Sequence, residues 1–276
     1  MFQSIQRQTG LPLFFDPLTS AIKWVGGIKV EKTSSRNFAE MKDYTAEALA
    51  QPTSDPIYLM YRSVARSEEY NIIRAARLRY DITVIPPGYF IGREKEFFRT
   101  AGHYHPVKPG TTAIYPEIYE VVSGRANLLI QKPKGGDPKA IDEIFTIEVG
   151  PGEKAVIPPG FGHMSVNAFD EPLVMANWIS ADFTYDYSPY KSMRGSAYWM
   201  IEGSTPEAIE FRKNGNYALV PELQKLRPRE LEDLGISHGE PLYSLVSELD
   251  KLAFLNAPED FINILTIDRC YQYVLN

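Results

Sequence analysis

The chain has 276 residues, of which 44% are hydrophobic and 23% are charged, and its formal net charge is −6 at pH 7. This length is enough for one large hydrophobic core, or for a core with a small additional module. No basic run interrupts the acidic balance, so we expect neither nucleic acid nor an anionic lipid surface as a partner. A phosphorylated ligand would have to be held by a few local donors, because the overall field opposes it.

The sequence also bears on the compartment. The N-terminus lacks the basic and apolar regions of a signal peptide. No stretch of about 20 apolar residues is present that could span a membrane. The single cysteine, Cys270, rules out an intramolecular disulfide and fits a reducing compartment. We therefore expect a cytoplasmic protein with no membrane partner.

The first third of the chain predicts short, interrupted elements. Residues 1–62 contain several glycine and proline breaks and are expected to form an arm with short strands. Within it, residues 37–50 carry apolar side chains at helical spacing, which predicts a helix with Ser35 as its cap. Residues 57–64 are rich in β-prone residues and predict a strand.

Residues 63–226 alternate β-prone segments with glycine and proline. Short strands separated by such turns indicate an antiparallel barrel or jelly roll. The strands are expected at residues 78–85, 117–131 with a break at Gly124, 145–149, 154–157, 163–167 and 172–179.

The arm also suggests how a barrel would associate. The part of the arm before Asn37 is apolar at Leu11, Leu13, Phe14 and Phe15 and has no predicted helix of its own that could bury this surface. The edge strands of a small barrel need cover, and swapping an arm onto a neighbouring copy is a low-cost solution. We therefore predict a homodimer.

Helix signals return late in the chain. Thr205-Pro206-Glu207 has the pattern of a capped helix start with proline at the first helical position. Residues 227–276 then predict a helical extension that packs on the outside of the barrel and stabilises it. Its apolar stripe comprises Leu242, Leu245, Val246, Leu249, Leu252 and Ala253, followed by apolar residues within 258–265. His238, beside Gly239, is expected to be idle.

Three of the 4 histidines, His103, His105 and His163, fall between residues 100 and 167. On a strand, His103 and His105 would point to the same face. Two buried imidazoles side by side cannot both be protonated without repulsion, and a bound cation resolves that conflict. Glu117 would add an oxygen ligand, and three imidazoles with one carboxylate suit Fe, Mn, Ni, Zn or Co better than Ca or Mg. The pair taken alone is equally compatible with an exposed His-x-His that binds nothing.

The spacing resembles that of the cupin superfamily. The second cupin signature is matched without a gap by Gly152, Pro158, Gly160, His163 and Asn167. The first is matched by His103, His105, Glu117 and Gly124, although eleven residues separate His105 from Glu117 and Phe97 stands where a glycine is usual. The resemblance implies one divalent transition metal per chain, Fe²⁺ favoured and Mn²⁺, Ni²⁺ or Zn²⁺ possible. Its ligands would be His103, His105, Glu117 and His163.

Glu120 is the alternative to Glu117 as the carboxylate ligand. It lacks a glycine at the offset that the signature requires. Its odd spacing from Glu117 points it to the opposite face of a strand. We therefore favour Glu117.

Within the superfamily, the chain is similar to the cupin-type phosphoglucose isomerases over roughly residues 11–226. The similarity rests on residues 82–88, 91–94, 100–105, 117–119, 124–131 and 156–163. It implies a mainly β fold: a cupin jelly-roll β-barrel at 63–226, an N-terminal arm at 1–62 and a C-terminal helical extension at 227–276. It also implies a homodimer that interconverts glucose 6-phosphate and fructose 6-phosphate.

The same resemblance implies roles for single residues. Glu117 would be the base that moves a proton between C2 and C1 of the sugar, and Tyr119 would lie beside the sugar. A direct hydride shift is the competing mechanism. The residues expected to bind substrate are Thr83, Thr100, Gly102 and Tyr187, with Arg93 as a further possible phosphate ligand.

Three positions depart from the family pattern and keep other functions open. Tyr185 replaces a histidine, Gly160 replaces a tyrosine, and Trp178 stands where a phosphate-binding tyrosine is common. A histidine donates, accepts and carries charge near neutral pH, which a phenol does poorly. A cupin Fe(II) dioxygenase and a non-catalytic sugar-binding cupin are the alternatives to the isomerase.

Overall fold

A computed structural model describes residues 1–47, 55–90, 92, 94–205 and 208–274. Arg93 and the expected helix start at Pro206 lie outside these residues, as does the end of the helix expected at 37–50. The predictions made for them stay predictions.

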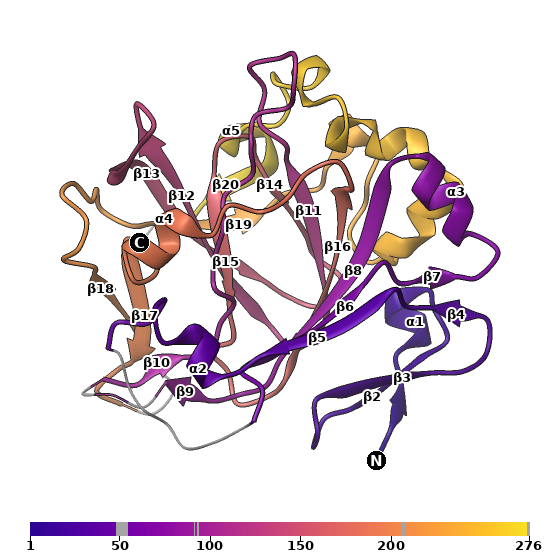
Figure 1. Cartoon of the computed structure of the whole chain (residues 1–276), viewed down its shortest axis with the longest axis horizontal. Helices are drawn as coiled ribbons and strands as arrows, with labels where there is room; N and C mark the ends of the chain where they lie inside the picture. The colour runs from indigo at the N-terminus through magenta and orange to yellow at the C-terminus, as the bar shows by residue number, and fades with distance from the viewer. Residues whose placement is uncertain (48–54, 91, 93, 206–207, 275–276) are drawn as a thin grey trace.

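Two largely antiparallel sheets form the body of the molecule (Figure 1). In the six-stranded sheet the order is β14 (Lys154–Ile157), β11 (Glu117–Ser123), β16 (Leu173–Ser180), β8 (Leu78–Ile85), β6 (Tyr58–Arg62) and β5 (Lys32–Arg36). In the five-stranded sheet the order is β15 (Gly162–Val166), β12 (Ala126–Lys134), β13 (Asp137–Val149), β19 (Gln224–Pro228) and β20 (Tyr271–Tyr273), with β19 parallel to β13. Residues of both sheets share one hydrophobic core, so the predicted mainly β, cupin-type barrel is confirmed.

The turn residues define the strands as the sequence predicts. β8 ends at Ile85, immediately before two prolines. Gly124 separates β11 from β12 with a φ of +76°, and a Cβ there would lie 2.6 Å from the carbonyl oxygen of Pro172. Only glycine fits both the backbone conformation and this close approach. β16 is buried over its whole length because one of its faces lines the barrel interior and the other is covered by the C-terminal segment.

Two local expectations are wrong. The strand expected at 145–149 begins at Asp137, because β12 and β13 pair as a long hairpin. The helix expected at 37–50 is, within the described residues, the single turn α2 (Phe38–Met41). Its cap is Asn37 rather than Ser35: the Asn37 side chain accepts from the Glu40 N–H, and the Glu40 side chain accepts from the Asn37 N–H. This reciprocal pair is a capping box.

The N-terminal arm covers its own apolar residues. It forms a small sheet of β1 (Gln3–Ser4), β2 (Leu13–Asp16) and β3 (Ala21–Trp24), with a one-turn helix α1 (Gln6–Thr9). Leu11, Leu13 and Phe15 are buried against the rest of the same chain. The premise that this surface needs a neighbouring copy is therefore wrong, and the homodimer itself stays a prediction.

Short elements complete the body of the chain. β4 (Ile28–Lys29) pairs with β7 (Ala65–Arg66), and a four-stranded sheet joins β18 (Ile209–Lys213), β17 (Tyr198–Glu202), β10 (Glu96–Phe97) and β9 (Tyr89–Phe90). Two short helices, α3 (Tyr70–Ala75) and α4 (Ser188–Ser192), lie between strands. None of the helices in the described part of the chain is long and apolar enough to cross a membrane.

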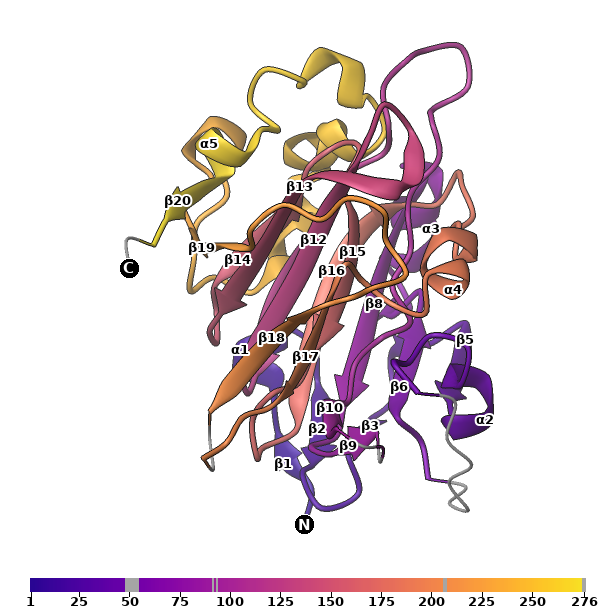
Figure 2. The ribbon, with the colours of Figure 1, turned by 90° about the vertical axis from the view of Figure 1, so that its left-hand side faces the viewer.

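The C-terminal segment packs along the outside of the barrel, as predicted (Figure 2, yellow). Its elements are 3₁₀ turns rather than α-helices: η1 (Glu232–Leu234), η2 (Leu242–Ser247), η3 (Leu249–Leu255) and η4 (Pro258–Asp260), followed by α5 (Ile267–Cys270) and β20. Leu242, Leu252 and Phe254 are fully buried. One core cluster contains Leu11 of the arm, Val84 of the barrel and Phe254 of this segment, so the three parts pack together.

Candidate metal centre

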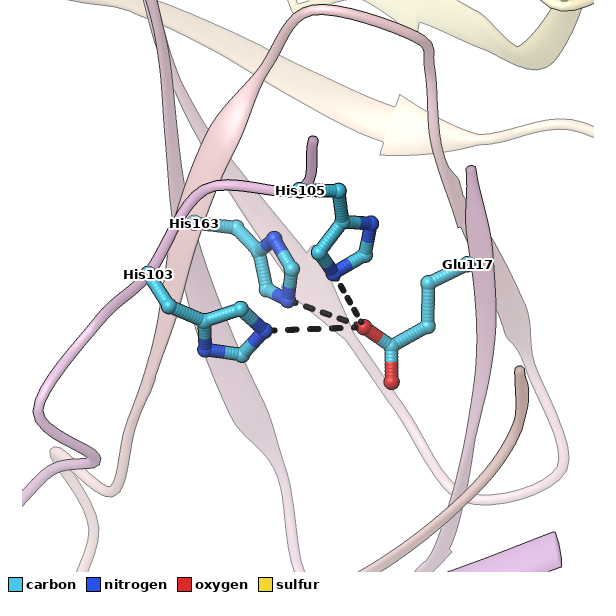
Figure 3. A group of neighbouring side chains, drawn as sticks. All are labelled: His103, His105, Glu117 and His163. Atoms are coloured by element: carbon cyan, nitrogen blue, oxygen red, sulfur yellow. Dashed lines mark ion pairs between the residues drawn. The ribbon is translucent and has the colours of Figure 1, made fainter. Parts of the chain in front are cut away.

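The four predicted metal ligands converge from separate segments of the barrel (Figure 3). His103 and His105 lie in the connection between β10 and β11, Glu117 opens β11, and His163 lies on β15. The backbones of His103 and His163 exchange two hydrogen bonds, which brings the first histidine segment against β15. The rings of His103 and His105 stack with centroids 5.2 Å apart, so the prediction that they share one face is confirmed.

The ligand atoms all point at one carboxylate oxygen. The Nε2 atoms of His103, His105 and His163 lie 3.9, 3.3 and 3.2 Å from Oε2 of Glu117. One candidate donor atom from each residue lies within 4.8 Å of the other three. The exposed fraction of Glu117 and of His163 is 1%, so water cannot satisfy these atoms from bulk solvent.

Neighbouring groups orient two of these ligands. Nδ1 of His105 lies 2.8 Å from the carbonyl oxygen of Tyr115. Since a carbonyl only accepts, Nδ1 carries the proton and Nε2 presents a lone pair to the site. The Asn177 amide donates to Oε1 of Glu117 at 2.6 Å, which leaves Oε2 facing the imidazoles.

Burial sets the charge state of the cluster. It lowers the pKa of His103 well below the ordinary value, with the neighbouring His163 adding to the effect, and it also lowers the pKa of His163. Burial pushes the pKa of Glu117 upward, but the three imidazoles around it outweigh this and hold that pKa well below its usual range. The cluster therefore presents neutral imidazoles and an ionised carboxylate, the forms that bind metal.

These residues fit a bound transition metal. Nε2 of His103, Nε2 of His105 and Oε2 of Glu117 are buried and have no hydrogen-bond partner among the described residues. Lone pairs and an anionic oxygen that converge without donors are unfavourable unless a cation satisfies them. Three nitrogens and one oxygen favour Fe, Mn, Ni, Zn or Co. His238 lies apart, where its Nδ1 accepts from the Lys154 N–H at 3.1 Å.

The five other predicted site residues line one small cavity beside His103. They are Thr83, Thr100, Gly102, Tyr119 and Tyr187, and the cavity has a volume of about 30 Å³. Within it, the Tyr119 hydroxyl lies 3.1 Å from Nε2 of His163. Gly102 has a φ of +78°, and a Cβ there would lie 2.6 Å from the Tyr190 ring, so the position requires glycine.

Of the residues that depart from the family pattern, only Tyr185 lies in this cavity. Its ring centroid is 4.1 Å from that of His103. Trp178 instead points to the outside of the sheet, where its Nε1 donates to the carbonyl oxygen of Leu242 at 2.8 Å. Its neighbour Asn177 is the residue of β16 that faces the site. Trp178 is therefore not among the residues that line this cavity.

Glu120 faces away from the metal centre, as its spacing predicts. Its Oε2 accepts from the Leu242 N–H at 2.8 Å, and its Oε1 lies 3.3 Å from Nζ of Lys154. The preference for Glu117 as ligand is consistent with this placement.

Sequence reasoning missed three charged residues at the mouth of the site. Arg62, at the end of β6, and Arg79, on β8, both contact the buried carboxylate of Asp81. The two-residue spacing of Arg79 and Asp81 on a predicted strand could have shown that they share a face. The contribution of Arg62 depends on how β6 pairs with β8, which the sequence does not reveal.

A barrel of two largely antiparallel sheets with three histidines and one glutamate on its inner side has the architecture of a cupin with a candidate metal site. The family profile described as "Glucose-6-phosphate isomerase (GPI)" matches residues 35–217. The chain therefore belongs to the glucose-6-phosphate isomerase family.

Curated relatives agree with this assignment. The glucose-6-phosphate isomerase of Thermococcus gammatolerans is 29% identical over 188 residues, which cover 67% of this chain and 89% of the relative. The glucose-6-phosphate isomerase of Pyrococcus abyssi is 29% identical over 196 residues, which cover 69% of this chain and 92% of the relative. Among solved structures, oxalate decarboxylase from Bacillus subtilis matches with a TM-score of 0.34 and 19% identity, over 49% of this chain and 29% of that chain. A structural similarity this weak has no bearing on the activity.

Proposed function

We propose that this chain interconverts glucose 6-phosphate and fructose 6-phosphate at the centre formed by His103, His105, Glu117 and His163. The observation that carries the proposal is the convergence of these four side chains beside the small cavity lined by Thr83, Thr100, Gly102, Tyr119 and Tyr187. Membership of the glucose-6-phosphate isomerase family supports the substrate.

The four ligands would hold one divalent metal, with Fe²⁺ favoured. When bound, such an ion supplies Lewis acidity that polarises the sugar carbonyl. The donor set of three nitrogens and one oxygen supports Fe²⁺, Mn²⁺, Ni²⁺ or Zn²⁺ over Ca²⁺ or Mg²⁺.

Glu117 is the proposed base. Its carboxylate is ionised, as a base requires. Its Oε2 lies 3.2 Å from Nε2 of His163, which in turn contacts Tyr119 of the small cavity. In the enediol route it removes the C2 proton of the open-chain sugar and returns it to C1. Tyr119 contacts His163 and lines the same cavity, which suits a residue that orients the sugar hydroxyls.

Thr83, Thr100, Gly102 and Tyr187 are the proposed substrate contacts. The Thr100 hydroxyl oxygen accepts from the Ser165 N–H at 3.0 Å, so its own proton can be donated to a ligand. Hydroxyl groups and free backbone N–H groups together form a suitable cradle for phosphate oxygens.

The proposal extends to the assembly and the compartment. We infer a homodimer, in line with the edge strands of the barrel, and a cytoplasmic enzyme, in line with a single buried cysteine. Light scattering tests the first: a mass near 31.3 kDa at micromolar concentration would contradict the homodimer.

A coupled isomerase assay tests the proposed function. Protein stripped with a chelator is reloaded with Fe²⁺, Mn²⁺, Ni²⁺ or Zn²⁺ and supplied with fructose 6-phosphate. We expect glucose 6-phosphate to form only with metal present. Sugar-phosphate binding without turnover for every metal would indicate a binding protein, and metal-dependent oxygen consumption would indicate a dioxygenase.

A further inference from the structure

A wide cavity adjoins the small cavity at the metal centre. It has a volume of about 650 Å³ and shares Met60, Arg62, Tyr185 and Tyr187 with the smaller one. We call it the basic vestibule. The charged residues that line it are Lys32, Arg36, Arg62, Arg74, Arg77 and Arg79 against Glu31 and Asp182. This concentration of positive charge lies on a chain whose net charge is −6.

The outer arginines of the vestibule have partners of their own. Arg74 pairs with Glu31 at 3.6 Å, and Arg77 pairs with Asp182. These pairs are exposed and close to neutral, so they leave little charge for a ligand. Arg36 likewise pairs with Glu40 at 3.4 Å, and Lys32 is exposed to solvent. Arg62 and Arg79 are the two arginines of the vestibule that share one partner.

Arg62 and Arg79 share a single carboxylate. Oδ2 of Asp81 lies 2.6 Å from Nη1 of Arg62 and 2.8 Å from Nε of Arg79, and Asp81 is fully buried. Its second oxygen accepts from the Ser63 N–H at 2.8 Å. Neither arginine forms another ion pair within the part of the chain that the structure describes. Two guanidinium groups on one carboxylate leave one positive charge without a counter-charge.

This surplus charge is held in place and shielded from solvent. The side chains of Arg62 and Arg79 are each 22% exposed, and Nη2 of Arg79 donates to the Tyr185 hydroxyl at 2.7 Å. A partly buried, uncompensated charge is costly unless a ligand or ion neutralises it. Guanidinium groups match phosphate oxygens with paired N–H donors, so a phosphoryl group is the chemistry that this pair recognises.

The arginine pair lies within reach of a sugar at the metal centre. Tyr185 links them: its ring centroid is 4.1 Å from that of His103, and the guanidinium carbons of Arg62 and Arg79 are 5.6 and 5.7 Å from the Tyr185 ring. The small cavity has roughly the volume that one water molecule occupies in the liquid. A hexose phosphate whose reacting carbons lie at the metal must therefore extend past the Thr83, Thr100 and Gly102 contacts toward Arg62, which lines both cavities.

We propose that the basic vestibule is an anion subsite in which Arg62 and Arg79 bind the phosphoryl group of the substrate. This inference rests on the proposed isomerase function. It adds two charged ligands to the threonine and glycine contacts, and it gives Asp81 the role of a positioning residue that holds both guanidinium groups. An open-chain sugar phosphate would then be fixed at one end by the metal ligands and at the other by the arginines.

Calorimetric titration with inorganic phosphate tests the subsite without any enzyme assay. We expect metal-stripped and metal-loaded protein to bind phosphate alike, because the arginines do not depend on the metal. Arg62→Met removes the surplus charge but leaves Asp81 paired with Arg79 and Tyr185 bonded to Arg79, so the affinity should fall by at least about tenfold. Arg227→Met is the matched control, because Arg227 pairs with Glu148 outside the vestibule. Its phosphate affinity should not change.

The conservative variant Arg62→Lys keeps the charge but loses the paired donors, so we expect an intermediate loss of affinity. If Arg62→Met does not fold, Arg62→Lys still tests whether Arg62 contributes to phosphate binding. Phosphate binding only in the metal-loaded protein, or unchanged affinity in either Arg62 variant, would overturn the subsite.

Kinetics then distinguish the substrate's phosphoryl group from a separate anion. In Arg62→Met we expect the KM for glucose 6-phosphate to rise at least about tenfold while kcat stays within about threefold. Inorganic phosphate should inhibit the wild type competitively. Noncompetitive inhibition with unchanged KM would assign the vestibule to a second anion and overturn the proposal. If no metal supports isomerisation, the proposed function fails, and the calorimetric titration still decides whether the subsite exists.

Discussion

The Asn177 side-chain amide donates a 2.6 Å hydrogen bond to Oε1 of Glu117 and so determines which carboxylate oxygen faces the three imidazoles. Both residues are buried, and they lie on the adjacent strands β16 and β11. A neighbour that orients a metal ligand contributes to affinity although it does not touch the metal.

Removing this amide should weaken metal binding. In Asn177→Ala the Glu117 carboxylate loses its buried donor and can rotate, so we expect the metal affinity to fall by about 10- to 100-fold. Competition with a chromophoric chelator measures this affinity. The exposed Asn71 provides the control, Asn71→Ala. Equal affinity in the two variants would show that Asn177 does not orient the ligand.

Loss of a histidine ligand should remove the metal almost entirely. His103→Ala leaves three ligands that cannot complete the coordination shell. His238→Ala is the control, since His238 lies outside the cluster. We expect elemental analysis to show about one metal per chain in the control and little in His103→Ala. Full occupancy in His103→Ala would contradict the assigned centre.

Glu117→Gln separates the two mechanisms. The variant keeps the size and one oxygen donor of the ligand but loses its basicity. If Glu117 is the base, kcat should fall by about 10²-fold or more in metal-loaded protein. The assay must be run at measured metal occupancy, so that weaker binding is not mistaken for slower chemistry. Unchanged turnover at equal occupancy would remove Glu117 as the base and favour the hydride shift.

The metal centre and the barrel could be predicted because their signals are local. Gly124 and the prolines after Ile85 mark the strand boundaries, and the four candidate ligands fall within two short segments that resemble the cupin signatures. Asn177, Arg62 and Asp81 could not be predicted, because their contacts depend on which strands pair and in which register. Asn177 faces the site only because β16 pairs with β11, and Arg62 meets Asp81 only because β6 lies beside β8.

Packing against the barrel also determines the structure of two segments, the C-terminal segment and the N-terminal arm, that local sequence patterns describe incompletely. The apolar spacing of the C-terminal segment predicts a buried face correctly, yet that face is formed by 3₁₀ turns, because contact with the barrel rather than helix propensity stabilises it. The apolar residues of the arm suggested a second copy, but the chain's own core accommodates Leu11 and Leu13.

The Glu120–Lys154 pair predicts a pH dependence of stability. Burial raises the pKa of Glu120 to about 7, although Lys154 and the Leu242 N–H oppose the rise. The ordinary value is 4.5, so between pH 4.5 and about 7 the folded chain keeps a proton that the unfolded chain releases. The stabilisation from this group is therefore fully present below pH 4.5 and is lost as the pH rises through 7.

Denaturant titrations from pH 4.5 to 8 test this prediction on the wild type and on Glu120→Gln. Relative to the variant, the wild type should lose on the order of 1 to 3 kcal/mol of unfolding free energy across the window. Lys154 keeps the carbonyl oxygens of Gly152 and Glu240 as partners in the variant. Glu232 is exposed, so Glu232→Gln is the control. The unfolding free energy of this variant should change with pH as that of the wild type does. Parallel profiles for wild type and Glu120→Gln would contradict the raised pKa.

The last prediction concerns the C-terminal segment, for which we predict a structural role. Truncation after Leu226 would cut β19 in half, so a point substitution is the cleaner test. Phe254 is fully buried, and Phe254→Ala should lower the unfolding free energy by about 3 to 5 kcal/mol through lost burial and a cavity. Ile262 is 47% exposed, so Ile262→Ala should cost less than about 0.5 kcal/mol. Metal content and kcat should match the wild type in both variants. Wild-type stability with lost isomerase activity in Phe254→Ala would instead place this segment in the catalytic cycle.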